Sequence, residues 1–177
     1  MTIEEKITFE PDPVWSDRYE KEREQILNRS GEGILDIFHV GSTAIPDLPG
    51  KTALDVIVVF ADYDSMRTTA DTLGQGSYEF GHEGSDCIVL LREADDHAVF
   101  VKMHIQDDEK VRSQLVFRDY LRENSEARRE YEQVKREAAA EHLHDQDTYT
   151  EAKSEVVRSL LKQAQKQGYA ENLPDFV

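Results

Sequence analysis

The chain has one cysteine, no long apolar run and few basic residues. Cys87 cannot form an internal disulfide, and a lone cysteine excludes the paired spacing of a zinc finger. Because Cys87 begins the apolar run 87–91, we expect it to be a plain core residue.

Membrane and export signals are also missing. No stretch approaches the roughly 18 apolar residues that a membrane span needs. Residues 1–6 lack the order of a secretory signal, in which basic residues precede an apolar stretch and then small residues. These absences predict a cytoplasmic protein with no membrane association.

Positive charge is scarce: the chain carries 21 basic against 37 acidic residues, a formal net charge of −16. Binding to duplex nucleic acid depends on lysine and arginine, so this balance argues against such a partner. Well-patterned apolar segments argue against disorder. Self-repulsion of this size destabilises a compact chain in dilute salt, which favours a salt-loving source.

The 177 residues suit one ordinary domain. We expect a single domain over 1–177, with a mixed α/β core over about 1–106 and a helical part over about 107–168 packed on it. No internal repeat or linker divides the sequence.

The first part of the chain predicts a mixed sheet with helices. Predicted helices cover Val14–Asn28, with Ser16 as a cap, and Tyr63–Leu73; predicted strands cover Ile34–Val40, Ala53–Phe60, Ile88–Arg92 and Val99–Ile105. The near-continuous apolar character of Ala53–Phe60 is typical of a strand covered on both faces. The last two strands should form an antiparallel pair.

The rest of the chain predicts three helices. The first is capped by Asp107 or Asp108, the second begins at the Ser125 cap, and the third begins at Asp147 and ends before Gly168. The glutamate-rich stretches 20–24 and 130–141 are most simply solvated helix faces.

A loop with anion-binding chemistry lies between the first two predicted strands. Gly41 lets the backbone approach a ligand closely, and the hydroxyls of Ser42 and Thr43 can bond phosphate. Lys51 adds a positive charge. Asp55 is the only charged residue of an apolar strand, where a carboxylate is costly to bury unless it is paired or metal-bound.

These residues carry a family resemblance. The matching residues are His39–Pro46, Leu48, Lys51 and Leu54–Val58, followed elsewhere by Asp12–Trp15, Lys102–Ile105, Phe117–Arg122 and Tyr149–Lys153. In this pattern, which covers nearly the whole chain, the sequence resembles the GrpB family. Some bacterial dephospho-CoA kinases carry a similar domain, which connects the resemblance to nucleotide or coenzyme A metabolism.

The resemblance implies the nucleotidyltransferase fold, in which a Gly-Ser turn precedes a strand with two carboxylates and a later strand supplies a third. Asp55 stands at the first carboxylate position, Ile57 at the second, and His104 where the third is usual. Losing a carboxylate counts against a two-metal mechanism. One divalent cation held by Asp55 and His104 is still compatible, and Mn²⁺ or Zn²⁺ would accept a histidine better than Mg²⁺.

The predicted helices supply further candidates for an anion pocket. Arg118 and Arg122 lie one helical turn apart and share a face, as do Tyr149 and Lys153. Surface salt bridges are the alternative interpretation for the two arginines.

The leading hypothesis is a nucleotidyltransferase-like protein. Ser42 and Thr43 would hold phosphate, Asp55 would hold Mg²⁺ or Mn²⁺ or act as a base, and His104 would assist. The ligand would be a nucleotide or a related phosphate-bearing metabolite. A catalytically degenerate anion-binding module and a pure interaction protein are the alternatives, and the oligomeric state is open.

Overall fold

The structure, a computed structural model, describes residues 7–8, 13–30, 32–142 and 144–177. Residues 1–6 and Asp12, which enter the predictions on targeting and on the family motif, lie outside these ranges. The strands are β1 (Ile7–Thr8), β2 (Ile34–Val40), β3 (Gly50–Lys51), β4 (Ala53–Phe60), β5 (Glu79–Glu83), β6 (Cys87–Glu93) and β7 (Ala98–Ile105). The helices are α2 (Trp15–Arg29), α3 (Tyr63–Gly74), α4 (Glu109–Glu123), α5 (Ser125–Glu141) and α6 (Gln146–Lys166), with a short 3₁₀ turn η1 (Ser42–Ala44).

The main sheet has five strands in the order β2-β4-β7-β6-β5. The central strands β4 and β7 run parallel, whereas the other neighbours pair antiparallel. The mixed α/β fold class is therefore confirmed, and so is the pairing of the two later predicted strands. Within the described residues, no helix is both long and apolar enough to cross a membrane.

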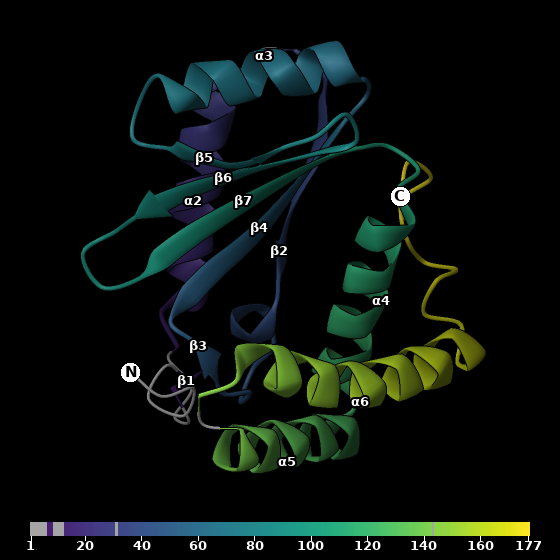
Figure 1. The fold of residues 1–177 in the computed structure, drawn as a ribbon. Helices are drawn as coiled ribbons and strands as arrows, with labels where there is room; N and C mark the ends of the chain where they lie inside the picture. The colour runs from purple at the N-terminus through teal and green to yellow at the C-terminus, as the bar shows by residue number, and fades with distance from the viewer. Residues whose placement is uncertain (1–6, 9–12, 31, 143) are drawn as a thin grey trace.

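Strand β4 is covered on both faces, as its apolar run predicts. Leu54, Val56 and Val58 belong to a core with α2 and α3. Ile57 and Val59 face the other way and pack with Val111 and Leu115 of α4. Figure 1 shows α2 behind the sheet and α4 on its near side. Because Asp55 has the same parity as Ile57, its carboxylate lies on the α4 side.

The three later helices form a layer of their own. Val116, Tyr120 and Leu121 of α4 pack with apolar residues of α5, α6 and the loop after η1. In Figure 1, α5 and α6 lie side by side below one end of the sheet, and α4 rises from them along it. This arrangement sets the helical layer against β2, β4 and the η1 turn, where the sequence places the candidate site.

Several local predictions differ from the structure. Helix α2 begins without a side-chain cap, so Ser16 does not cap it. Asn124 rather than Ser125 occupies the cap position of α5, and Asp145 caps α6 two residues before the predicted start. The sequence pattern does not predict strand β5, because its residues are exposed and, apart from Phe80 and Gly81, polar; such exposure is typical of an edge strand that pairs on one side only.

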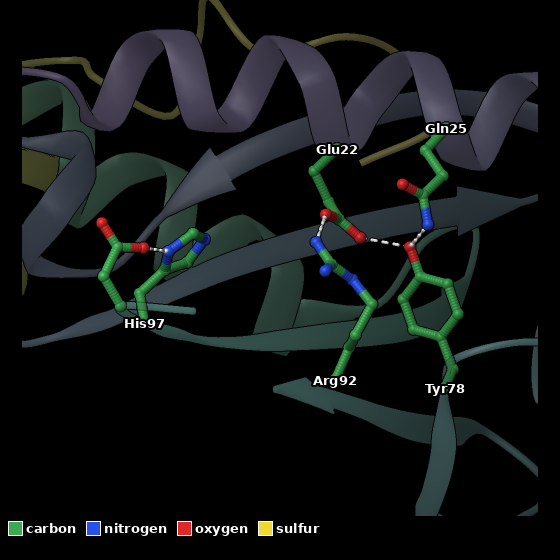
Figure 2. Close-up of polar contacts among 6 residues, drawn as sticks. Glu22, Gln25, Tyr78, Arg92 and His97 are labelled. Carbon is green, nitrogen blue, oxygen red and sulfur yellow. Dashed lines mark hydrogen bonds and ion pairs between the residues drawn. The ribbon is translucent and has the colours of Figure 1, made fainter. Parts of the chain in front are cut away.

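The stretch 20–24 is not uniformly solvated, because Glu22 is 2% exposed. Its carboxylate accepts hydrogen bonds from the Arg92 guanidinium and the Tyr78 hydroxyl. Figure 2 shows these side chains meeting between α2 and the sheet, with Gln25 beside Tyr78. The prediction of a solvated face is wrong at this position because the carboxylate has buried partners.

Candidate functional site

A cavity of about 910 Å³ lies on the α4 side of the sheet. Its polar lining residues include Gly41, Ser42, Thr43, Lys51, Asp55, Lys102, His104, Lys110, Lys135, Tyr149 and Lys153. Eight of the ten residues proposed from the sequence thus border one space. Arg118 and Arg122 are not among the lining residues.

The turn after β2 brings its backbone against the Asp55 carboxylate. Gly41 has φ 76°, a value that side-chain-bearing residues rarely adopt. A Cβ atom at this position would lie 2.6 Å from Asp55 Oδ2. Glycine is therefore required both by the backbone conformation and by the close approach.

A buried histidine fixes the hydroxyl of Thr43. His39 Nε2 lies 2.9 Å from Thr43 Oγ1, and the His39 ring stacks on Tyr19 at 5.0 Å. Burial, aided by Arg122 and Arg118, lowers the pKa of His39 to about 4. The imidazole is therefore neutral at pH 7, and it orients the turn without adding charge to it.

The two arginines of α4 support this turn from outside the cavity. Arg118 donates to the His39 carbonyl at 3.2 Å and also contacts Asp119. Arg122 donates to the Ala44 carbonyl at 2.8 Å and lines a separate cavity of about 460 Å³. The one-turn spacing of the two arginines lets each donate to a backbone carbonyl at or next to the turn, so they support the turn. They do not line the cavity around Asp55.

Ser42 is held by a lysine that the sequence did not single out. Lys135 of α5 is 3% exposed, and its ammonium donates to Ser42 Oγ at 2.9 Å and to the Pro49 carbonyl at 2.7 Å. A Cβ at Gly50 would lie 2.4 Å from the Ser42 Cβ, so only glycine lets β3 pack here. The stretch 130–141 is thus not a purely solvated face.

Burial makes the helical lysines unusual. It lowers the pKa of Lys135 to about 7, an effect that Lys153 and Lys51 strengthen and Glu132 opposes. Burial also lowers the pKa of Lys153, again with help from Lys51. Within the described residues neither forms an ion pair with a carboxylate; Lys135 lies over the Tyr131 ring and Lys153 over the Tyr149 ring. An anion entering the cavity would therefore stabilise both charges.

Asp55 has a lysine where a metal ligand would be expected. Lys102 of β7 is beside Ile57 in the strand register, and its Nζ lies 3.4 Å from Asp55 Oδ1. Within the described ranges no group of three or more His, Cys, Asp or Glu side chains is arranged to hold a metal ion. A carboxylate next to an ammonium and an isoleucine does not fit a metal pair.

His104 shares the face of Asp55 but not its neighbourhood. In the parallel register Asp55 lies beside Phe100 and His104 beside Val59, so the two are four positions apart, or about 13 Å along the sheet. The His104 ring instead bonds Asp108 through Nδ1 at 2.8 Å and approaches Cys87 Sγ through Nε2 at 3.8 Å. The structure therefore does not bring Asp55 and His104 together as joint ligands.

Cys87 is not the plain core residue that its apolar run predicts. It is partly exposed, and it lines the cavity. Alternation along β6 explains this, because Ile88 and Leu90 point into the core and Cys87 and Val89 point to the other face. The period of two could have placed Cys87 on the face of His104, but only the strand pairing puts them opposite each other.

Comparison with known sequences agrees with the family motif. A profile of the family described as GrpB protein matches residues 7–163. A UPF0157 protein of Streptomyces coelicolor is 32% identical over 154 residues, which cover 86% of this chain and 81% of that protein. A UPF0157 protein of Halalkalibacterium halodurans is 30% identical over 166 residues, which cover 88% and 80% of the two chains.

Comparison with solved structures gives the same fold. The conserved protein GrpB from Enterococcus faecalis has a TM-score of 0.76 and 26% identity, and the match covers 91% of this chain and 98% of that one. A chain of the GLD-2/RNP-8 complex has a TM-score of 0.61 at 12% identity, covering 96% and 65%. The Cid1 poly(U) polymerase has a TM-score of 0.52 at 12% identity, covering 74% and 43%. The last two show a nucleotidyltransferase-like fold alone.

Proposed function

Because the chain belongs to the GrpB family and has a nucleotidyltransferase-like fold, we propose that its cavity binds a nucleotide or a related phosphate-bearing metabolite. Lysines would supply the positive charge that a metal pair supplies in active nucleotidyltransferases. This is the anion-binding module that the sequence leaves open as an alternative to a transferase.

The distribution of lysine carries the proposal. Five of the nine lysines of the sequence line this cavity, namely Lys51, Lys102, Lys110, Lys135 and Lys153. They face only two carboxylates there, Asp55 and Glu109, although the chain has 37 acidic residues. A concentration of one charge sign within a concave site attracts and holds the opposite charge. In this acidic protein the cavity is therefore suited to an anion.

The turn and the helices divide the task of holding phosphate. Ser42 and Thr43 lie in the η1 turn. Lys135 contacts the Ser42 hydroxyl and His39 contacts the Thr43 hydroxyl, so both hydroxyls are already oriented. Lys135 and Lys153 approach from α5 and α6, so phosphate oxygens would lie between the sheet and the helical layer. The Ser42 hydroxyl can donate to phosphate while it accepts from Lys135.

The rest of the cavity suits the non-phosphate part of the ligand. Its volume of about 910 Å³ lies near the upper end of the range for small-molecule sites. Phe100, Phe117 and Tyr149 line it and offer apolar and aromatic surface. A nucleotide combines the two chemistries, an anionic end for the lysines and a flat ring for the aromatic side chains.

Metal-dependent nucleotidyl or phosphoryl transfer is the second candidate, and Asp55 favours it. The residue stands at the first carboxylate position that the resemblance implies for the nucleotidyltransferase fold, and it lines the cavity. Mg²⁺ or Mn²⁺ would have to displace the Lys102 ammonium to reach this carboxylate. Transfer would therefore require metal, whereas binding through the lysines would survive a chelator.

Calorimetric titration with ATP, UTP, coenzyme A and pyrophosphate, each with Mg²⁺, with Mn²⁺ and with chelator, tests the proposal. Lys153→Gln should weaken binding by about 10- to 100-fold, the value of one charge-assisted hydrogen bond. Lys162→Gln is the matched control, because Lys162 is exposed on the same helix and does not line the cavity. Equal losses in both variants, or no binding of any of these anions, would overturn the proposal.

A further inference from the structure

A second group of reactive side chains, apart from Asp55, borders the same cavity through two of its three members, Cys87 and His104. Cys87 of β6, His104 of β7 and Asp108 at the start of α4 form a connected row. Cys87 and His104 are direct partners in the antiparallel register of β6 and β7. The sequence separates Cys87 from Asp108 by a whole strand, so only the folded sheet assembles the row.

The hydrogen bonds assign a role to each nitrogen of His104. Asp108 Oδ2 lies 2.8 Å from Nδ1, and a carboxylate at that nitrogen keeps its proton in place. The other nitrogen, Nε2, then carries the lone pair and lies 3.8 Å from Cys87 Sγ. His104 is 5% exposed, so bulk water does not compete strongly for these contacts. The ring is set to accept the thiol proton.

Asp108 is itself held as an anion. Partial burial would raise its pKa, but the hydrogen bonds from His104 and from the Lys110 amide outweigh burial and lower it. Asp108 also caps α4, whose N-terminal dipole favours a negative charge. The backbone turns into this position through Asp107, which has φ 62°. Asp108 therefore has one fixed orientation toward the imidazole.

We propose that Cys87, His104 and Asp108 form a nucleophile, a base and a positioning carboxylate, and that Cys87 accepts the acyl group of an acyl phosphate. His104 Nε2 takes the thiol proton, and Sγ attacks the carbonyl carbon. The carbon–oxygen bond to phosphate then breaks, and the phosphate leaves with its electron pair. The products are S-acyl Cys87, phosphate and protonated His104.

The donor class rests on the proposed anion site, whereas the row of residues does not. Lys102 and Lys110 lie near enough to Cys87 to influence its thiol, and they would face the leaving phosphate. Burial and the neighbouring Asp86 raise the pKa of the Cys87 thiol, so at pH 7 it is protonated until a base removes the proton. An acyl phosphate unites the anion that these lysines would bind with the carbonyl that a thiol attacks.

Alkylation by neutral iodoacetamide tests the row independently of anion binding. The chain has one cysteine, so the rate reports on Cys87 alone. At pH 7 the native protein should react faster than the urea-unfolded chain, and His104→Gln should slow it by about 100-fold, the lower end of general-base effects. Native labelling no faster than that of the unfolded chain, or labelling that His104→Gln leaves unchanged, would overturn the proposal.

The pH profile distinguishes positioning by Asp108 from support of the fold. Wild-type labelling should depend weakly on pH between 7 and 9, whereas labelling of Asp108→Ala should rise steeply with pH across this range, because burial and Asp86 keep the pKa of the Cys87 thiol raised and little thiolate forms without the base. Glu126→Gln, an exposed acidic residue in the first turn of α5 that does not line the cavity, should keep the wild-type profile. Identical profiles for both variants would contradict the role of Asp108. Circular dichroism and thermal melting check the fold of each variant.

Acetyl phosphate tests the donor. Mass spectrometry of intact protein should show one added acetyl group, which is absent in Cys87→Ser, about 100-fold slower to form in His104→Gln and released by hydroxylamine. Rapid alkylation without acetylation would overturn the acyl-phosphate assignment. Failure of nucleotide and pyrophosphate binding, with alkylation intact, would instead count against the proposed anion site.

Discussion

The two faces of the main sheet treat buried charge in opposite ways. On the α2 side, the Glu22 carboxylate meets the Arg92 guanidinium and the Tyr78 hydroxyl, and the group is closed within the protein. On the α4 side, Lys135 and Lys153 are largely buried but bond only neutral groups or lie over aromatic rings, within the described part of the chain. The Glu22 cluster on the α2 side completes its own charges, whereas these two lysines on the α4 side have no bonded carboxylate among the described residues, although Lys102 on that side pairs with Asp55.

This difference distinguishes a buried charge that supports the fold from a buried charge that is available to bind a ligand. A buried ion pair adds little net stability, yet removing one partner is costly because the other is left unpaired. Lysines buried without a carboxylate partner already carry that cost in the folded state, which their lowered pKa values express. A phosphate would relieve it. The predictions below test whether the two faces respond to substitution, pH and salt with this contrast.

Breaking the closed face should give the largest effect. Glu22→Ala leaves the Arg92 guanidinium half-buried without its carboxylate, and the free energy of unfolding should fall by about 3 kcal/mol. Urea denaturation measures the loss. Glu24→Ala, an exposed position on the same helix, should stay within about 0.5 kcal/mol of wild type. Similar losses of unfolding free energy in the two variants would show that the buried Glu22 carboxylate contributes no more to stability than an exposed one.

Removing a lysine from the open face should affect binding more than stability. Lys135→Met relieves the cost of a buried charge but also removes the hydrogen bonds to Ser42 and Pro49, so the unfolding free energy should change by less than about 1 kcal/mol. Pyrophosphate affinity should fall by about 30-fold. Calorimetry and urea denaturation give the two quantities. A large loss of stability with unchanged affinity would make Lys135 a structural residue.

The sequence predicted the fold better than the pairing of side chains. The apolar period of β4 and the turn signals around it place Asp55, Gly41 and Ser42 correctly, because these follow from local pattern. Lys135 and Lys102 could not be identified in this way, since they reach the site from elements that pack there only after folding. The family motif supplied positions but not the register that separates His104 from Asp55.

The absence of tertiary information in the sequence pattern also explains why the prediction of solvated glutamate-rich faces and the prediction of a core cysteine were wrong. Glu22 and Lys135 lie in glutamate-rich helical stretches whose average character is solvated, and a single buried position does not alter that average. Cys87 lies in an apolar run, yet it begins the strand on the side that faces the cavity. In each case the tertiary partner decides the environment, and a one-dimensional pattern contains no information about that partner.

Sulfate binding should weaken as pH rises through about 7. The pKa of Lys135 is about 7 in the free protein, so at pH 6 it is charged and at pH 8 it is mostly neutral. A bound anion favours the charged form and raises this pKa, so binding at pH 8 must take up a proton. Affinity should therefore fall by about tenfold between pH 6 and pH 8. Sulfate itself does not titrate in this range.

Two variants assign this pH dependence to a residue. Lys135→Gln should flatten the profile, whereas His104→Gln should preserve it although His104 also lines the cavity. Titrations in buffers of different ionisation enthalpy should show proton uptake at pH 8 in wild type and in His104→Gln, but not in Lys135→Gln. A profile that survives in Lys135→Gln would place the titrating group elsewhere on the open face.

Salt should produce the smallest effect, with opposite signs for the fold and the cavity. The net charge of −16 repels itself over the surface, and molar KCl screens that repulsion, so the melting temperature should rise from low to molar salt. A gain of about 1 kcal/mol corresponds to roughly 2–4 °C for a domain of this size. Sulfate affinity should fall over the same range, because salt also screens the attraction of the lysines. Melting curves and sulfate titrations along one KCl series measure both.

Glu24→Gln, which removes one exposed surface charge, should slightly reduce the thermal gain without altering the loss of affinity. A melting temperature that stays flat would remove the inference of a salt-adapted surface, and the lysine-lined cavity would still be tested by the falling affinity.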